Sequence, residues 1–270
     1  MKINSFNPVA KAYSQTVAPY RFSQFLTLVH ELKLKGNEKV LDIGSGPGEL
    51  SMQIVQRLNA GGFLYGIDLS SKMIQLARET ASKSGYSNTF FQVGDALNME
   101  FEDNTFDIVV SSNAFPWVPN RNRFLQEVLR VLKPGGRFGL VALSNKCYKE
   151  FTEAFKKITK DNPGFFPNGK PFEIMGAKLH SLLELKNFVS KNGFMIDKYF
   201  QLSTEEPIKA DEYLKRVNAI VNENYLDYLE NNGHRQKIRN QVFQALQNKN
   251  GNLKITESSV FILAQKPKVN

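Results

Sequence analysis

The chain has 270 residues, a hydrophobic fraction of 41% that is typical of a globular protein, and a formal net charge of +9 at pH 7. No apolar run approaches the ~20 residues of a membrane span, and the N-terminus has no continuous apolar segment of the secretory kind. The single cysteine, Cys147, excludes an internal disulfide and a cysteine metal cluster. We therefore expect a cytoplasmic protein with no membrane partner and no metal site.

The positive charge has two interpretations. A basic surface can bind nucleic acid, whereas scattered Lys and Arg residues can simply form a solvated surface. The densest cluster is Lys156, Lys157 and Lys160, and no aromatic-rich strand of the RNA-binding type accompanies it. The sequence therefore disfavours a nucleic-acid partner.

Residues 39 to 143 alternate between short buried strands and amphipathic helices. Strand patterns lie at residues 39–45, 63–70, 89–95, 106–114 and 137–143, and helix patterns lie at 48–58, 71–85 and 121–136. Strands that alternate with helices predict an α/β fold with a parallel sheet covered on both faces. Such doubly wound sheets bind ligands beyond the carboxyl ends of their strands, where the strand order reverses.

The alternation stops after Leu143. Residues 146–180 combine helical and loop patterns, and residues 209–249 are mostly helical. The remaining patterns are a helix at 182–193 behind a capping box (Ser181 and Glu184) and strands at 194–202 and 253–266. Because the sequence has no repeat and no low-complexity linker, we interpret the two helical blocks as insertions into one sheet domain.

A glycine-rich turn follows the first strand. Gly44, Gly46 and Gly48 form a G-x-G-x-G pattern, which differs from the G-x-G-x-x-G of dinucleotide-binding turns. Without a Cβ atom the backbone can approach a ligand closely. Asp42 precedes the turn, and its carboxylate would repel a pyrophosphate but attract an ammonium or a sulfonium. The pattern therefore disfavours NAD and favours S-adenosylmethionine.

Two further acidic residues end strands. Asp68 ends the second strand, where a carboxylate can accept hydrogen bonds from both ribose hydroxyls. The alternative is an N-cap for the next helix, a role that Ser70 or Ser71 can fill instead. Asp95 ends the third strand and is placed to accept a bond from an adenine amino group, or else serves as a turn residue.

These motifs resemble the class I S-adenosylmethionine-dependent methyltransferases over residues 38–143. The resemblance implies a Rossmann-like, doubly wound sheet of seven strands with the last strand antiparallel, helical insertions forming a lid, and S-adenosylhomocysteine as product. It also implies a set of cofactor-binding residues. This set is Asp42, Gly44, Ser45, Gly46 and Gly48 at the turn, Asp68 and Leu69 at the ribose and adenine, Asp95 and Ala96 at the adenine edge, and Ser111 near the methionine amino group.

A subgroup resemblance involves Trp117 and Val118. Trans-aconitate, malonyl-carrier and juvenile-hormone-acid methyltransferases carry a similar Trp-Val pair and an N-terminal Ala-x-x-Tyr pattern, comparable with Ala10 to Tyr13. In them the N-terminal segment covers the cofactor, and the acceptor is a carboxylate. This chain departs from them at Pro116, where the relatives usually have Gln or His.

The resemblance suggests how the domain spanning residues 1–270 is organised. The predicted parts are an N-terminal helical lid (1–35), a cofactor-binding core (36–145), helical insertions over the substrate site (146–180 and 209–249) and the last strand (253–266). Lid candidates are Tyr13, Tyr20 and Arg21. Phe115 and Trp117 follow the fourth strand, and either they wall the substrate pocket or they pack in the core.

The function expected from these features is methyl transfer to a small molecule, with a carboxylate as the favoured acceptor. A carboxylate is ionised at neutral pH and needs no general base, and we assign none. His30, His180 and His234 have no assigned role. A nucleic-acid methyltransferase and a non-catalytic cofactor-binding protein are the alternatives. The first lacks the expected Asn/Asp-Pro-Pro-aromatic motif, and the intact glycine turn with its acidic residues argues against the second. The oligomeric state stays open.

Overall fold

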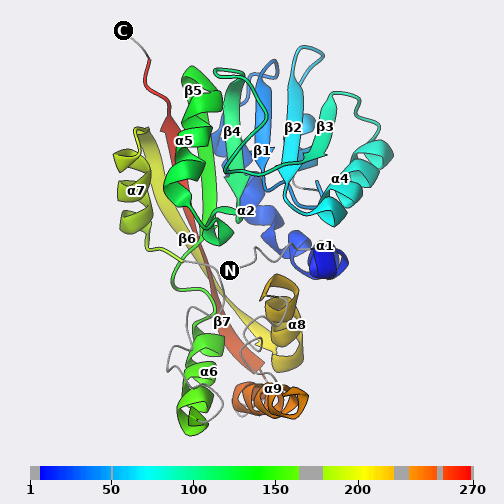
Figure 1. Cartoon of the computed structure of the whole chain (residues 1–270), viewed down its shortest axis with the longest axis vertical. Helices are drawn as coiled ribbons and strands as arrows, with labels where there is room; N and C mark the ends of the chain where they lie inside the picture. Colours follow the sequence, from blue (N-terminus) through cyan, green and yellow to red (C-terminus); the bar gives the residue numbers. More distant parts are fainter. Residues whose placement is uncertain (1–6, 50, 164–178, 222–230, 248–251, 269–270) are drawn as a thin grey trace.

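A computed structural model describes residues 7–49, 51–163, 179–221, 231–247 and 252–268 (Figure 1). The strands are β1 (Lys39–Ile43), β2 (Phe63–Asp68), β3 (Thr89–Val93), β4 (Phe106–Ser112), β5 (Leu132–Leu143), β6 (Met195–Lys209) and β7 (Asn252–Gln265). The helices are η1 (Asn7–Val9), α1 (Ala10–Thr16), α2 (Ala18–Glu31), α3 (Ser51–Val55), α4 (Ser71–Ser84), η2 (Phe115–Trp117), α5 (Arg121–Val131), α6 (Lys149–Asp161), α7 (Leu182–Lys191), α8 (Ala210–Val221) and α9 (Asn232–Gln247).

The strands form one seven-stranded sheet in the order β3-β2-β1-β4-β5-β7-β6. Strands β1 to β5 pair in parallel, and β7 pairs antiparallel with both β5 and β6. The predicted fold class is therefore confirmed, including the antiparallel last strand. The strand order reverses between β1 and β4, and this is the point where doubly wound sheets bind ligands.

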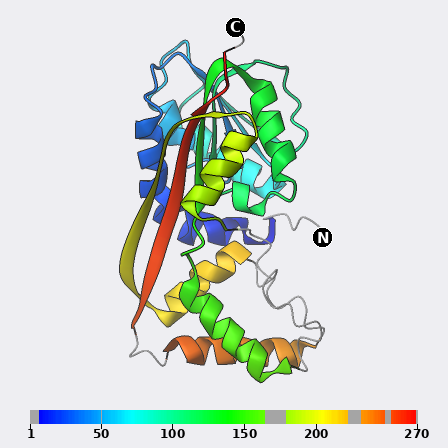
Figure 2. The same ribbon diagram turned by 90° about the vertical axis from the view of Figure 1, so that its left-hand side faces the viewer.

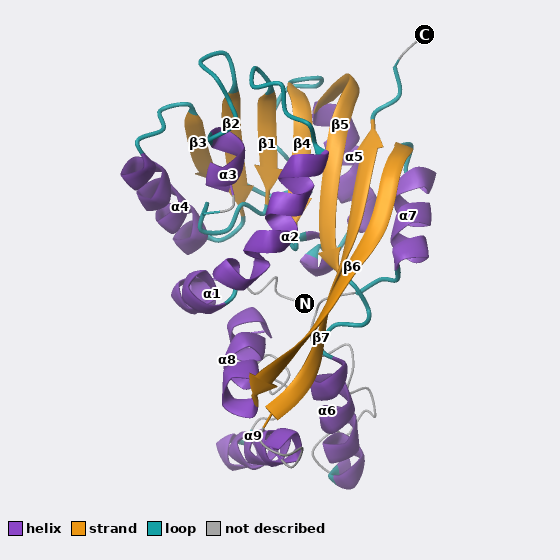
Figure 3. Cartoon of the chain, turned by 180° about the vertical axis from the view of Figure 1, so that it is seen from behind, coloured by secondary structure: helices purple, strands orange, loops and turns teal. Residues whose placement is uncertain are grey.

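Helices cover both faces of the sheet (Figure 3). Phe25, Leu28 and Ile74, from α2 and α4, pack in one buried cluster with residues of β1, β2 and β4. On the other face Phe124 and Leu185, from α5 and α7, pack with residues of β4, β5 and β7. Because both faces are covered, the central strands β1, β4 and β5 are mostly buried.

A helical cap stands beyond the carboxyl ends of the parallel strands. Leu143, the last residue of β5, pairs with Ser259, and β7 continues past it as a two-stranded ribbon with β6 down to the pair Asn252 and Lys209. Helices α6, α8 and α9 gather around the far end of this ribbon (Figures 1 and 2). Their buried residues form one cluster with β7, which includes Phe151, Val217, Val242 and Ile255.

Two predicted boundaries were wrong. The helix that Pro134 and the two following glycines are predicted to close already ends at Val131, and β5 begins at Leu132 instead of residue 137. Pro134 disfavours a helical residue before it, and Gly135 adopts a φ of +76°. The strand pattern at 194–202 continues to Lys209 as β6, a largely exposed edge strand without an apolar period. Pro207 is tolerated there because β6 has a neighbour on one side only.

Local capping follows the sequence. Ser181 and Glu184 form the predicted capping box of α7, and Ser70 caps α4 by accepting from the backbone N–H of Met73. Among the described residues, no helix is long and apolar enough to cross a membrane.

Candidate active site

The glycine turn lies at the carboxyl end of β1 and is fastened to β2. The backbone N–H groups of Gly44 and Ser45 donate to the carbonyl oxygen of Ile67 at 2.8 and 3.0 Å. Gly44, Gly46 and Gly48 have φ values of +73°, +55° and +82°, which favour glycine. The turn is therefore a fixed left-handed segment at the point where the strand order reverses.

The three glycines differ in what surrounds them. A Cβ atom at Gly44 would collide with Ala114, and one at Gly48 would lie 3.0 Å from the Cα atom of Ala77. A Cβ atom at Gly46 would meet no atom within 4 Å. Gly44 and Gly48 thus allow close packing of the turn, whereas Gly46 faces open space, as a backbone cradle for a ligand requires.

Asp68 is bound to the same turn. Its Oδ2 accepts from the backbone N–H of Gly46 at 3.0 Å, and its Oδ1 accepts from the backbone N–H of Ser70 at 2.9 Å. Burial raises the pKa of Asp68, and these two hydrogen bonds lower it in part. Because Ser70 caps α4, the alternative of Asp68 as N-cap is wrong. A carboxylate has about four acceptor sites, so ribose hydroxyls can bind beside the two backbone donors.

Asp42 lies beneath the turn and is 2% exposed. The hydroxyl of Ser51 donates to its Oδ2 at 2.5 Å. Burial raises the pKa of Asp42 to about 7, and the nearby charge of Asp68 contributes. The carboxyl is therefore close to a protonation switch at neutral pH, and a positive ligand at the turn would favour its ionised form.

The N-terminal segment contacts the loop after β1 and the loop after β2. Asn7 Oδ1 accepts from the Ser70 hydroxyl at 2.6 Å, and the Ser14 hydroxyl donates to Glu49 Oε1 at 2.5 Å. Burial raises the pKa of Tyr13, on the same segment, and the charges of Arg21 and Asp68 act on it in opposite directions. Sequence reasoning missed Asn7, Ser14 and Glu49, because no motif or spacing marks them.

The predicted adenine residues lie at the ends of β2 and β3. The N–H of Gly94 donates to the carbonyl oxygen of Asp68 at 3.1 Å, which holds the turn after β3 against the end of β2. Leu69 and Asp95 are exposed and Ala96 is half-buried. Asp95 Oδ1 accepts from the backbone N–H of Leu97 at 2.8 Å.

The residues after β4 have several environments. Ser111 is fully buried, and its hydroxyl donates to the carbonyl oxygen of Ile43 at 3.0 Å, which ties β4 to β1. Asn113, which the sequence did not single out, has a φ of +59°. Phe115 is fully buried, with its ring centroid 5.4 Å from that of Phe124, so its position is in the core. Trp117 is half-buried against the cap cluster.

A buried polar group joins the N-terminal segment to the cap. Arg21 is 2% exposed, donates to the hydroxyl of Tyr148 at 2.8 Å and lies 3.3 Å from Glu257 Oε2. Burial raises the pKa of Cys147 to about 11 and also raises the pKa of Tyr148. Neither side chain is therefore ionised at neutral pH. The side chain of Tyr20 lies outside the described residues.

The histidines lie apart from one another. His180 Nε2 is 3.1 Å from Arg121 Nη1, and the same guanidinium donates to the carbonyl oxygen of Pro116 at 2.7 Å. His30 and His234 are exposed on α2 and α9. Among the described residues, no group of three or more His, Cys, Asp or Glu side chains could hold a metal ion.

The residues at the glycine turn fit S-adenosylmethionine. Gly46 offers an open backbone face and Asp68 a buried carboxylate. In the described part of the chain, Ser45 Oγ and Asn113 Oδ1 are buried without a hydrogen-bond partner. Unsatisfied buried polar atoms beside a strand switch point are typical of a ligand site.

Fold and site together define a class I S-adenosylmethionine-dependent methyltransferase. A family model described as "Methyltransferase domain" matches residues 34–233, and the chain belongs to this family.

Relatives are similar over part of their length. The chain is 28% identical over 180 residues to phosphoethanolamine N-methyltransferase 2 of Caenorhabditis elegans, covering 66% of this chain and 38% of that protein. It is 26% identical over 172 residues to the demethylmenaquinone methyltransferase of Lactobacillus johnsonii, covering 61% of this chain and 70% of that protein.

A solved methyltransferase structure from Haemonchus contortus has a similar fold. It is phosphoethanolamine N-methyltransferase 2 in complex with phosphomonomethylethanolamine and S-adenosylhomocysteine. The TM-score is 0.59 at 22% identity, and the match covers 96% of this chain and 57% of that chain.

We predict that Asp68→Ala weakens S-adenosylhomocysteine binding by about 1–3 kcal/mol, because a charged acceptor for buried hydroxyls is lost. Titration calorimetry measures this difference. Asp107→Ala is the matched control, because Asp107 pairs with Lys133 near the starts of β4 and β5, away from the carboxyl ends of the strands where the candidate site lies. Equal affinities for Asp68→Ala and the parent protein would show that the ribose is held by other residues.

We also predict that the unliganded protein loses stability as the pH rises from about 4 to 7. Across that window the folded state retains a proton on Asp42, whose pKa is raised from 3.8 to about 7, while the unfolded chain has released it. The free energy of unfolding therefore falls, and Asp42→Asn should flatten the slope. Urea denaturation of the parent protein and of Asp42→Asn at several pH values tests this. The same dependence of unfolding free energy on pH in both proteins would contradict it.

The contacts of Asn7 and Ser14 predict a third outcome. S-adenosylhomocysteine should slow hydrogen exchange in α1, because ligand at the turn and Asp68 stabilises the segment bonded to both loops. Mass spectrometry of the exchanged peptides measures this effect, with α7 as the internal control. Identical exchange of α1 with and without ligand would make it a fixed structural helix.

Proposed function

We propose that this protein transfers a methyl group from S-adenosylmethionine to a small organic acceptor held between the strand ends and the helical cap. The observation that carries the proposal is the open face of Gly46 beside Asp68, at the strand switch point and under the N-terminal segment. When bound, the cofactor supplies an electrophilic methyl group. The protein's own part is to align the acceptor with it and to exclude water.

The cap junction supports a carboxylate as the acceptor. Arg21 is a buried cation on α2, and cations in such positions bind carboxylates strongly. Glu257 Oε2 lies 3.3 Å from the same guanidinium, and burial raises the pKa of Glu257 while the charge of Arg21 lowers it. The raised pKa values of Cys147 and Tyr148 make both groups poor sources of a neutral-pH base. An ionised carboxylate needs none.

The subgroup resemblance points to the same class of acceptor. Trp117, which corresponds in sequence to the Trp of the Trp-Val pair in those carboxylate methyltransferases, lies half-buried against the cap cluster. The relatives in the comparisons are named for other acceptors, a demethylmenaquinone and a phosphoethanolamine. The acceptor proposal therefore depends on Arg21 and on the subgroup resemblance, and it does not derive from these relatives.

The competing functions make different demands. A nucleic-acid methyltransferase would use the basic surface, and Lys156, Lys157 and Lys160 are exposed on α6. A non-catalytic protein would bind the cofactor without turnover. Both are outcomes of the acceptor experiment.

We predict methyl transfer from radiolabelled cofactor to carboxylic acids in a panel that also contains phenols, amines, a demethylated quinone and folded RNA. The double variant Arg21→Gln/Glu257→Gln keeps a neutral hydrogen-bonded pair in place of the ion pair. It should raise the KM for the acid about tenfold or more, because a charge-assisted contact is lost.

The matched control is Arg137→Gln/Glu38→Gln, which changes an ion pair between β5 and the start of β1. It should leave the KM unchanged. Turnover confined to amines, the quinone or RNA would defeat the carboxylate proposal, and cofactor binding with no turnover on any acceptor would favour a binding protein.

A further inference from the structure

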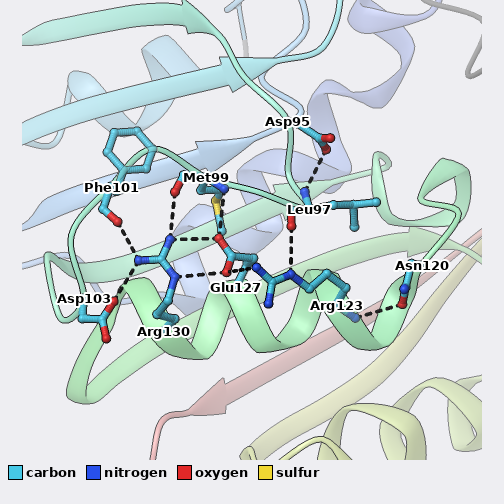
Figure 4. Close-up of polar contacts among 9 residues, drawn as sticks. All are labelled: Asp95, Leu97, Met99, Phe101, Asp103, Asn120, Arg123, Glu127 and Arg130. Atoms are coloured by element: carbon cyan, nitrogen blue, oxygen red, sulfur yellow. Dashed lines mark hydrogen bonds and ion pairs between the residues drawn. The ribbon is translucent and has the colours of Figure 1, made fainter.

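The segment from Asp95 to Asp103, between β3 and β4, is held by side chains of α5. Leu97, Met99 and Phe101 present their carbonyl oxygens to this helix (Figure 4). The backbone of this segment is therefore satisfied by side chains, and their loss would release it.

Two arginines bind the three carbonyls. Arg123 Nε donates to the carbonyl oxygen of Leu97 at 3.0 Å. Arg130 Nη2 donates to that of Met99 at 2.8 Å, and Arg130 Nη1 donates to that of Phe101 at 2.6 Å. A guanidinium holds several donors in one rigid plane, so each arginine also has donors left for a carboxylate.

Glu127 supplies that carboxylate. It is 2% exposed, and its Oε2 accepts from the backbone N–H of Met99 at 2.9 Å. Arg130 binds both of its oxygens, through Nε at 3.0 Å and Nη2 at 2.8 Å, and Arg123 Nη2 lies 3.0 Å from Oε1. These hydrogen bonds lower the pKa of Glu127. One buried carboxylate thus fixes both guanidinium groups on one face of α5.

The held segment begins at the predicted adenine site. Asp95 Oδ1 accepts from the backbone N–H of Leu97, and the N–H of Asn98 donates to the carbonyl oxygen of Asp95 at 3.1 Å. The residue whose N–H orients the Asp95 carboxylate is therefore the same residue whose carbonyl Arg123 holds. A shift of Leu97 would turn the carboxylate away from its position.

We propose that Arg123, Glu127 and Arg130, the α5 clamp, are positioning residues for adenine recognition. They contact the loop and not the cofactor, and they set the direction of the Asp95 carboxylate. This inference rests on the proposed function, because it takes the adenine amino group to bind at Asp95. It extends that proposal from residues that contact the adenine to residues that orient the contacting carboxylate.

The experiment compares S-adenosylhomocysteine with S-inosylhomocysteine, in which an oxygen replaces the adenine amino group. Calorimetry gives the affinity of the parent protein and its variants for each ligand. Arg123→Ala is the main variant, because the Arg123 side chain is 47% exposed and its removal should leave the fold intact. Glu127→Gln is the second variant, and thermal unfolding reports the stability of both.

The parent protein should prefer S-adenosylhomocysteine. Both variants should bind it about tenfold more weakly, because loss of a supporting contact misorients a binding group. S-inosylhomocysteine binding should change less, so the preference for adenine falls. Arg123→Lys should restore part of it. Lys133→Ala, which removes a 2.7 Å ion pair with Asp107 next to α5, is the matched control and should change neither affinity.

A folded Arg123→Ala protein with unchanged affinity and unchanged preference would overturn the inference. Equal weakening of both ligands would also overturn it, because that is the result of a purely structural role. Equal binding of both ligands by the parent protein would overturn the inference, because it would show that the adenine amino group is not recognised at Asp95. A parent protein that binds neither would refute the proposed function itself.

Discussion

The end of β1 is joined to the end of β2 by backbone hydrogen bonds, and the candidate site is arranged around this junction. The carbonyl oxygen of Ile67 accepts from Gly44 and Ser45, and the carboxylate of Asp68 accepts from Gly46. The carbonyl oxygen of Asp68 in turn accepts from Gly94 at the end of β3. Three strand ends are thus fixed relative to one another through two adjacent residues. The left-handed glycines are what allow the turn to come this close.

The cap depends on a different constraint, the length of the β6–β7 ribbon. Because β7 continues beyond its last pair with β5, α6, α8 and α9 have a support that projects past the strand ends. Arg21 then connects the N-terminal segment to this support through Tyr148 and Glu257. The desolvation of such a buried pair is costly, so its geometry must be well determined.

Much of the fold could be predicted from the sequence, because its signals are local. Buried strands, amphipathic helices and the capping box of Ser181 and Glu184 are each visible in a short window. The end of β6 could not be found in this way, since an exposed edge strand needs no apolar period. The long pairing of β6 with β7 also places residues together that are far apart in the sequence, and no local pattern records that.

The same distinction holds for the candidate site. The glycine turn and Asp68 follow from motif spacing, and the structure brings them together. Motif spacing does not reveal Glu49, Asn113 or the α5 clamp, because their roles depend on contacts between separate elements. The N-terminal segment shows why such contacts matter, since the charges of both Asp68 and Arg21 act on the pKa of Tyr13. One short helix, α1, thus borders both the predicted cofactor residues and the cap junction. Displacement of that helix would therefore disturb both parts of the site at once, which links cofactor binding physically to the shape of the proposed acceptor region.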